Sequence, residues 1–256
     1  MMSTSHAWAG LSRHAQNEQM KMVVFPFAGG NATAFHSWLR DLPGHDWLSL
    51  DILQLPGRAD RANEALLTDF NQIVDGIFPD LVRLAGEGPL LMMGYSMGAC
   101  LAYELTLRLE HRCGVSPVGL LLAARKAPAF YYATEERRYF DQERMRQEIR
   151  RLGGTPEAVL RNPEVFEHFY KVLSADFQAL ESYRPDLNSV VQAPIAVIGG
   201  IDDPETDIGQ LYAWQRHAHS SFDLHMLKGG HFFIQTEKQA LLRLLHHYAV
   251  IFKDRF

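Results

Sequence analysis

A serine with a glycine two residues away on either side is the strongest candidate nucleophile in the sequence. It is Ser96, within the stretch Gly94–Gly98 (GYSMG), which follows the apolar run Leu90–Met93 and precedes a compact helix start. A strand, a tight turn and a helix in this order form a nucleophile elbow, in which the turn leaves no room for side chains beside the serine. The helix start offers N–H groups, first that of Met97, to a developing oxyanion. We predict that Ser96 is a nucleophile, and a structural turn with an incidental serine is the alternative.

A serine hydroxyl needs a base to accept its proton, and after an elbow the acid and then the histidine follow along the chain. His231 stands shortly after the apolar run Phe222–Leu227, in KGGHFF (228–233), and before the last helical segment. This places it in a loop at the carboxyl end of a strand, where ligands bind in α/β sheets. His217 and His219 end a charged helix, which favours solvated side chains. No cysteine or carboxylate clusters with them, so we expect no metal site.

The acid that orients His231 should follow the preceding strand. The run Ile195–Ile198 leads into the adjacent Asp202 and Asp203, while Asp207 would fall inside the next helix. Successive loop residues point apart, so only one of the pair can orient His231 and fix its tautomer. The spacing does not choose between them.

An oxyanion hole needs a second N–H group beside that of Met97. The loop Phe25–Gly30 (FPFAGG) follows the first strong apolar run, and its glycines suit a close approach of backbone to a ligand. A simple glycine turn is the alternative interpretation.

Short, continuously apolar runs between helical patterns indicate the elements that position these residues. Strands are predicted at Met22–Phe27, Leu90–Met93, Val118–Ala124 and Ile195–Ile198, and more weakly at Trp47–Leu53 and Phe222–Leu227. Helices are predicted at Phe70–Leu84, Met97–Glu110, Thr206–Ala218 and Gln235–Phe252. Alternation of strand and helix predicts an α/β fold with a mostly parallel central sheet.

One region breaks the alternation. From Pro128 to Pro185 there is no convincing strand, but Thr134–Arg151 is rich in charge, and apolar residues recur at helical spacing between Val165 and Leu180. A helical insertion after the carboxyl end of a strand would lie over the site as a lid. An ordinary extra layer of helices is the alternative.

Composition limits the class of protein. The 256 residues allow one large domain or two small ones, and Ser96 and His231 must meet in one site, so we expect a single domain over residues 1–256 with the lid at about 128–185. A net charge of −5 argues against nucleic-acid binding.

No apolar run in the sequence approaches the roughly 20 residues of a membrane-spanning helix. Two cysteines give no disulfide framework, and nothing in the first 20 residues resembles a secretory signal, so a cytoplasmic protein is expected.

Together these segments resemble the type II thioesterases, the stand-alone α/β-hydrolases that accompany nonribosomal peptide and polyketide synthases. The resemblance runs from about residue 22 to the final helix and rests on FPFAGG (25–30), QLPGR (54–58) with Arg61, GYSMG (94–98), ARKAP (124–128), GGIDDP (199–204) with Trp214, and GGHFF (229–233). It implies an α/β-hydrolase fold, places the catalytic acid at Asp203 and the oxyanion amides at Ala28 and Met97, and matches the insertion to the family's lid. Tyr95 departs from the family, which often has histidine before the nucleophile. The Pro-Gly-Arg segment has no catalytic role that its residues reveal.

The resemblance also implies a substrate: an acyl group held as a thioester on the phosphopantetheine arm of an acyl or peptidyl carrier protein. The family's proposed role is editing, the removal of stalled or aberrant acyl groups, in peptide, polyketide or siderophore synthesis. No cofactor, nucleic acid or membrane is implied, and a monomer is expected. Lid aromatics could wall an acyl channel, with Phe130, Tyr131, Phe169 and Phe177 as candidates.

Arginines of the charged segment could bind an acidic carrier protein. The segment itself also holds acidic residues, so a solvated face of the helix is an equally good interpretation.

Three other functions stay open at this point. They are a carboxylesterase or lipase acting on free esters, a catalytically silent protein that binds carriers, and an acyltransferase or cyclase.

Overall fold

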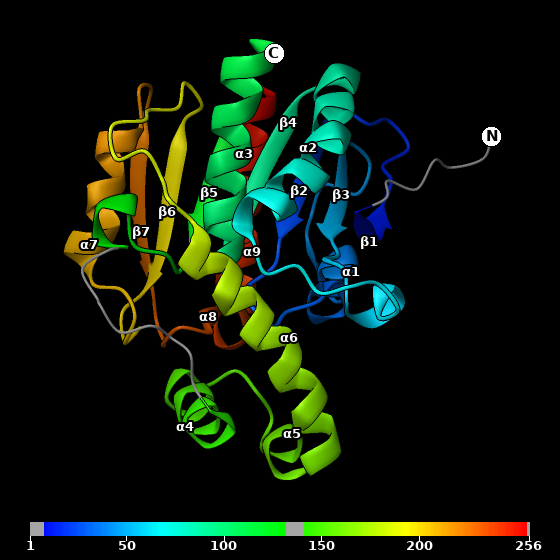
Figure 1. The fold of residues 1–256 in the computed structure, drawn as a ribbon. Helices are drawn as coiled ribbons and strands as arrows, with labels where there is room; N and C mark the ends of the chain where they lie inside the picture. Colours follow the sequence, from blue (N-terminus) through cyan, green and yellow to red (C-terminus); the bar gives the residue numbers. More distant parts are fainter. Residues whose placement is uncertain (1–7, 132–140, 255–256) are drawn as a thin grey trace.

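The computed structural model describes residues 8–131 and 141–254 and is built on one seven-stranded sheet in the order β1-β3-β2-β4-β5-β6-β7 (Figure 1). The strands are β1 (Ala9–Arg13), β2 (Met20–Phe25), β3 (Leu48–Leu53), β4 (Leu90–Tyr95), β5 (Gly119–Ala123), β6 (Ile195–Gly200) and β7 (Phe222–Leu227). All neighbours pair in parallel except β1 and β3. The mostly parallel sheet predicted from the apolar runs is therefore confirmed.

All six predicted strands are present, with ends shifted by a few residues. The seventh, β1, was not predicted. It is an antiparallel edge strand whose side chains are half-buried or exposed, so it lacks the continuous apolar run of a strand covered on both faces. The sequence signal for such an edge is weak.

Helices cover both faces of the sheet. The α-helices outside the insertion are α1 (Trp38–Asp41), α2 (Phe70–Glu87), α3 (Met97–Cys113), α7 (Ile208–Tyr212), α8 (Phe233–Thr236) and α9 (Lys238–Lys253). Short 3-10 turns are η1 (Ala32–Phe35), η2 (Ala59–Arg61), η3 (Pro128–Phe130) and η4 (Ala213–His217). In Figure 1, α2 and α3 lie in front of the sheet and α9 behind it.

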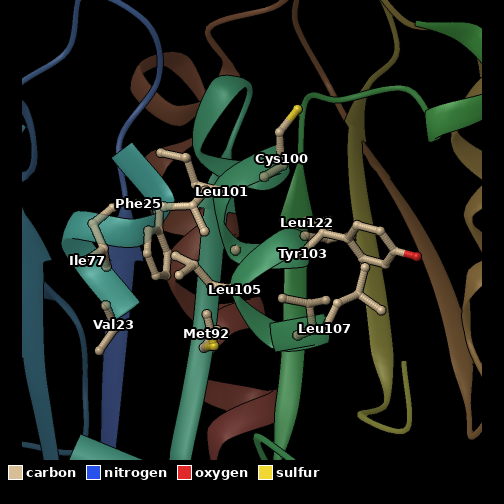
Figure 2. Packing of buried hydrophobic residues seen from close by; sticks show 14 of the residues in the cluster. Val23, Phe25, Ile77, Met92, Cys100, Leu101, Tyr103, Leu105, Leu107 and Leu122 are labelled. Atoms are coloured by element: carbon tan, nitrogen blue, oxygen red, sulfur yellow. The ribbon is translucent and has the colours of Figure 1, made fainter. Parts of the chain in front are cut away.

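Two apolar cores result, one on each face. Figure 2 shows the core under α2 and α3, where Phe25 of β2 and Met92 of β4 meet Ile77 of α2 and Leu105 of α3. The second core joins the other face of the sheet to α1, α8 and α9. Helix α2 is typical of the pattern: Asp69 caps its start by accepting a hydrogen bond from Gln72 N (2.9 Å), and its apolar residues recur on the buried face.

Two predicted helices are divided. The segment predicted as one helix over Thr206–Ala218 is α7 followed by η4, and the one over Gln235–Phe252 is α8 followed by α9. The second break falls at Glu237, whose φ of −116° and ψ of 28° are not helical. Apolar periodicity continues across both breaks, which is why the pattern alone could not locate them.

The insertion between β5 and β6 contains α4 (Gln142–Leu152), α5 (Glu157–Arg161) and α6 (Pro163–Ser182). These helices lie on the side of the molecule toward which the strand arrows point (Figure 1). They share a third apolar cluster, in which Met145 of α4 and Leu160 of α5 pack with Phe166 and Leu173 of α6. Residues 132–140, which include the first part of the charged segment 134–151, lie outside the described residues. No helix in the described ranges is long and apolar enough to cross a membrane.

Candidate active site

The turn between β4 and α3 holds Ser96 in a strained conformation. Its φ is 53° and its ψ is −112°, a region that residues other than glycine rarely adopt. The flanking glycines are required by space, because a Cβ at Gly98 would collide with the carbonyl oxygen of Phe25, and one at Gly94 with the backbone of Gly98 and Ala99. The turn thus matches the expected elbow, with Ser96 half-buried at the carboxyl end of β4.

His231 lies beside Ser96 although the two are 135 positions apart in the sequence. Its Nε2 is 3.1 Å from Ser96 Oγ, and its Nδ1 is 2.9 Å from Asp203 Oδ2 and 3.1 Å from Oδ1. The carboxylate accepts from Nδ1–H, which leaves Nε2 free to accept the serine proton. Only 6% of His231 is exposed, so these hydrogen bonds are largely shielded from water.

Of the two adjacent aspartates, Asp203 is the one that contacts His231, and Asp202 is exposed. Two further donors hold the Asp203 carboxylate. Glu205 N–H donates to Oδ1 (2.8 Å), and the Thr206 hydroxyl donates to Oδ2 (3.0 Å). Both oxygens are therefore hydrogen-bonded, which fixes the orientation of the carboxylate toward His231.

Tyr95, the departure from the family pattern, links the elbow to the loop that carries the histidine. Its hydroxyl donates to the carbonyl oxygen of His231 (2.7 Å) and accepts from Ile234 N–H (3.2 Å). Burial raises the pKa of this phenol well above its usual value, so it remains a neutral donor. The substitution therefore leaves the serine, histidine and aspartate in contact and supplies two buried hydrogen bonds behind them.

Ala28 and Met97, the two residues assigned to the oxyanion hole, belong to the loop after β2 and to the start of α3. Met97 is the first residue of α3, and Ala28 lines the same pocket as Ser96 and His231. Within the described ranges, neither N–H donates a hydrogen bond to another residue. A tight turn shapes the Ala28 loop, with Gly30 N–H donating to Phe27 O (2.9 Å) and Gly29 at a φ of 74°.

A buried ion pair beneath this loop was not predicted from the sequence. Arg58 Nη1 and Nη2 donate to Asp176 Oδ2 (2.6 Å) and Oδ1 (2.7 Å), and Gly29 N–H donates to the same Oδ2 (2.7 Å). Arg58 belongs to the Pro-Gly-Arg segment, for which no role was evident, and Asp176 lies in α6. The available signal was an aspartate on the apolar face of a helix, between Leu173 and Leu180.

A pocket of about 50 Å³ opens beside Ser96 and His231. Its apolar walls come from Phe27, Phe232 and, in α6, Phe177 and Leu180, and its polar rim from Arg125, Lys126 and Glu205. Apolar walls with a few polar groups are typical of pockets that bind small molecules.

Of the four aromatic residues considered for an acyl channel, Phe177 is the one that lines the pocket beside Ser96. Phe169 packs over Gly29, and Phe130 packs against the core. The guanidinium carbon of Arg125 lies over the ring of Tyr131, 4.5 Å from the ring centroid. Aromatic composition alone did not reveal which rings face the pocket.

His217, expected to be solvated, is buried, and that expectation is wrong. Its Nδ1 lies 2.8 Å from Ser189 O and 3.1 Å from the Tyr103 hydroxyl, and burial lowers its pKa. It ends η4 on the inner side, beside Trp214. Among the described residues no group of three or more histidines, cysteines and carboxylates could hold a metal ion.

Comparison with known proteins identifies the family of this chain. The model of the thioesterase domain family matches residues 20–249. The gramicidin S biosynthesis protein GrsT of Aneurinibacillus migulanus is 31% identical over 89% of this chain and 88% of its own. Thioesterase PikA5 of Streptomyces venezuelae is 31% identical over 91% and 82%.

A solved structure shows the same fold. The type II thioesterase BorB from the borrelidin biosynthetic cluster superposes with a TM-score of 0.82 at 30% identity, covering 95% of this chain and 98% of its own. The elbow, the histidine loop and the seven-stranded sheet thus occur in a chain that belongs to the thioesterase family of α/β-hydrolases, which cleave thioesters.

Proposed function

We propose that Ser96 is the nucleophile of this thioesterase, His231 its general base and acid, and Asp203 the residue that orients and stabilises His231. The observation that carries the proposal is the position of His231, within hydrogen-bond distance of both Ser96 Oγ and the Asp203 carboxylate. This is the arrangement in which a neutral serine becomes reactive.

The reaction proceeds in two halves. Ser96 Oγ gives its proton to His231 Nε2 and attacks the thioester carbonyl, and the oxyanion accepts hydrogen bonds from the N–H groups of Ala28 and Met97. The C–S bond then breaks, His231 protonates the leaving thiol, and an acyl-serine ester remains. Water gives a proton to His231 and attacks this ester. The ester C–O bond then breaks, His231 returns the proton to Ser96 Oγ, and the carboxylic acid leaves. No cofactor takes part in either half.

The proposed substrate is an acyl group on the phosphopantetheine arm of a carrier protein, and the proposed role is editing. One relative is named for gramicidin S biosynthesis and a similar structure comes from the borrelidin cluster, which supports a synthase as the partner. The walls formed by Phe27 and Phe177 suit an acyl chain. Helices α4, α5 and α6 would act as the lid over it.

The arginines of α4 give little support to an electrostatic docking site. Arg150 pairs with Glu157, Arg151 pairs with Glu148 and Glu205, and Arg146 lies over the ring of Phe166 (3.6 Å). This favours a solvated, internally paired face of the helix. Arg137 and Arg138 lie outside the described residues.

The test compares two substrates with the same acyl group, one as a carrier-protein thioester and one as a free ester, with wild-type protein and Ser96→Ala. We expect faster turnover of the carrier thioester, measured by mass spectrometry of the carrier, and no turnover by the variant. Preference for the free ester would favour an esterase. If the protein binds the carrier but shows neither turnover nor labelling of Ser96 by a fluorophosphonate, a catalytically silent binding protein would be favoured. An acylated amine or alcohol product would identify an acyltransferase or cyclase.

A further inference from the structure

We propose that Arg58 and Asp176 are positioning residues: they fasten the loop that carries the Ala28 N–H to the helix α6, and so hold one half of the oxyanion hole in its working geometry. The inference rests on the proposed function, because it concerns the amide assigned to the oxyanion there. It assigns a role in the reaction to two residues that do not line the active-site pocket.

The contacts join three separate parts of the chain. Arg58 comes from the loop after β3, Gly29 and Gly30 from the loop after β2, and Asp176 from the middle of α6. Asp176 Oδ2 accepts both the Gly29 N–H (2.7 Å) and Arg58 Nη1 (2.6 Å), and Nη1 also lies 3.3 Å from Gly30 O. One carboxylate oxygen and one guanidinium nitrogen therefore hold both ends of the Gly-Gly pair.

Burial makes this arrangement rigid. Arg58 is 4% exposed and Asp176 is fully buried, so neither charge can turn toward water. Hydrogen bonds between charged groups are short and strong, and a bidentate guanidinium–carboxylate pair also fixes the relative orientation of its partners. A buried charge that lost its partner would be left without compensation, so the two side chains stay together as long as the protein is folded.

The packing around the pair leaves the loop little space. A Cβ placed on Gly29 would lie 3.0 Å from Leu173 and 3.1 Å from Phe169, both on the face of α6 that carries Asp176. Ala28 itself packs against the cluster formed by α4, α5 and α6. The loop is thus held from one side by the turn bond between Gly30 and Phe27 and from the other by α6.

Ala28 lies between these two attachments. Without an acceptor for the Gly29 N–H, the peptide that joins Ala28 to Gly29 can rotate, and the preceding N–H moves with it. An oxyanion donor must meet the oxygen at about 2.7–3.1 Å, and the loss of one such donor lowers kcat by about 10²–10³-fold. A donor that is present but badly aimed should cost less, about 10- to 100-fold.

Two double variants separate positioning from structural support. Arg58→Met with Asp176→Leu removes both charges together and fills the space with apolar groups, which avoids an uncompensated buried charge. Arg58→Met with Asp176→Asn also removes both charges but keeps an oxygen that can accept from Gly29 N–H, and it adds an amide NH2 group in place of the second carboxylate oxygen. The two side chains at position 176 have nearly the same shape, so the second variant is the matched control for the first.

The assay uses the full chain and a butyryl thioester of N-acetylcysteamine, which needs no carrier protein. We expect the Leu variant to lose about 10- to 100-fold in kcat with KM changed less than about threefold, and the Asn variant to retain at least about fivefold more kcat than the Leu variant. The Leu variant should also bind an alkyl boronic acid, whose serine adduct is tetrahedral, more weakly by the same factor as its loss in kcat/KM.

Three measurements keep the outcomes distinct. Thermal unfolding should show both double variants folded at the assay temperature. Arg161→Gln removes an exposed pair with Glu157 within α5 without touching the loop or the pocket, and should leave kcat within about twofold of wild type. Equal kcat in the two double variants, or unchanged boronic acid binding, would overturn the positioning role. Activity in Ser96→Ala would overturn the proposed function instead.

Discussion

The loops at the carboxyl ends of β4, β6 and β7 and the outer helices of the insertion, α4 and α5, lie near one pocket but are held in opposite ways. The loops are joined by buried hydrogen bonds, in which Tyr95, Asp203 and His231 are each satisfied on more than one side. Outside its few apolar contacts, α4 is held by exposed ion pairs such as Arg150 with Glu157. Pairs of this kind contribute about 0–1 kcal/mol each. The contrast separates the proposed catalytic frame, which is held by buried hydrogen bonds, from a cover, α4 and α5, whose surface is held by weaker ion pairs.

The largest effect on kcat should come from substituting the two residues at the centre of the frame, Ser96 and His231. Ser96→Ala and His231→Ala should each lower kcat by roughly 10⁴–10⁶-fold, because the serine then has no nucleophilic oxygen or no base. Stopped-time assays with an acyl-carrier thioester would measure the loss, and circular dichroism would check the fold. A loss below tenfold in either variant would contradict the proposed roles.

The next effect tests which aspartate belongs to the frame. Asp203→Asn should lower kcat by roughly 10²–10⁴-fold, because an amide favours the wrong tautomer of His231. Asp202→Asn, one residue earlier and exposed, should change kcat less than about twofold. The reverse order of the two effects would move the acid to Asp202.

A smaller effect should follow from loosening the frame behind the elbow. Tyr95→Phe leaves the His231 carbonyl and the Ile234 N–H without a protein partner, which should cost about 1–3 kcal/mol of unfolding free energy. Chemical denaturation measures that cost. A further, several-fold decrease in kcat at unchanged KM would show that the bonds also position the imidazole, whereas an unchanged stability would mean that they are replaced by water.

The smallest effect should come from substituting a residue on the surface of the cover. Arg150→Gln removes an exposed pair, so the unfolding free energy should change by no more than about 0.5 kcal/mol. Glu157 provides an independent check, because hydrogen bonds from Arg150 and Arg161 lower its carboxyl pKa. In the variant that pKa should rise, as measured by NMR titration. A loss of stability comparable to that of Tyr95→Phe would remove the distinction between frame and cover.

Much of the frame could be predicted because each of its residues lies at or shortly after the carboxyl end of a parallel strand. Ser96 and His231 could be chosen by their position after an apolar run, since parallel strands bring their carboxyl ends to one edge. The choice between Asp202 and Asp203 depends on the direction of a side chain in a loop, which spacing does not encode. His217 looked solvated because its neighbours are charged, but the helix presents it inward to Tyr103.

The contact between Asp176 of α6 and Arg58 could not be predicted from local sequence patterns. Arg58 and Asp176 are 118 positions apart, and neither stands in a segment whose periodicity requires a charge. The fold must be known before the two can be paired. The sequence offers only the oddity of an acid among apolar residues, which is a reason to search for its partner rather than a means to identify it.

Helix α6 contributes both to the pocket and to the loop that carries Ala28, and this limits how the enzyme can be re-engineered. The same helix supplies Phe177 to the wall of the pocket and Asp176 to the loop beneath it, at consecutive positions. Substrate preference can be altered by exchanging α4 and α5, or by resizing Phe177 alone. A graft that replaces the whole insertion with that of another hydrolase must bring a carboxylate to the same place, or it will change the substrate pocket and disable the catalyst together.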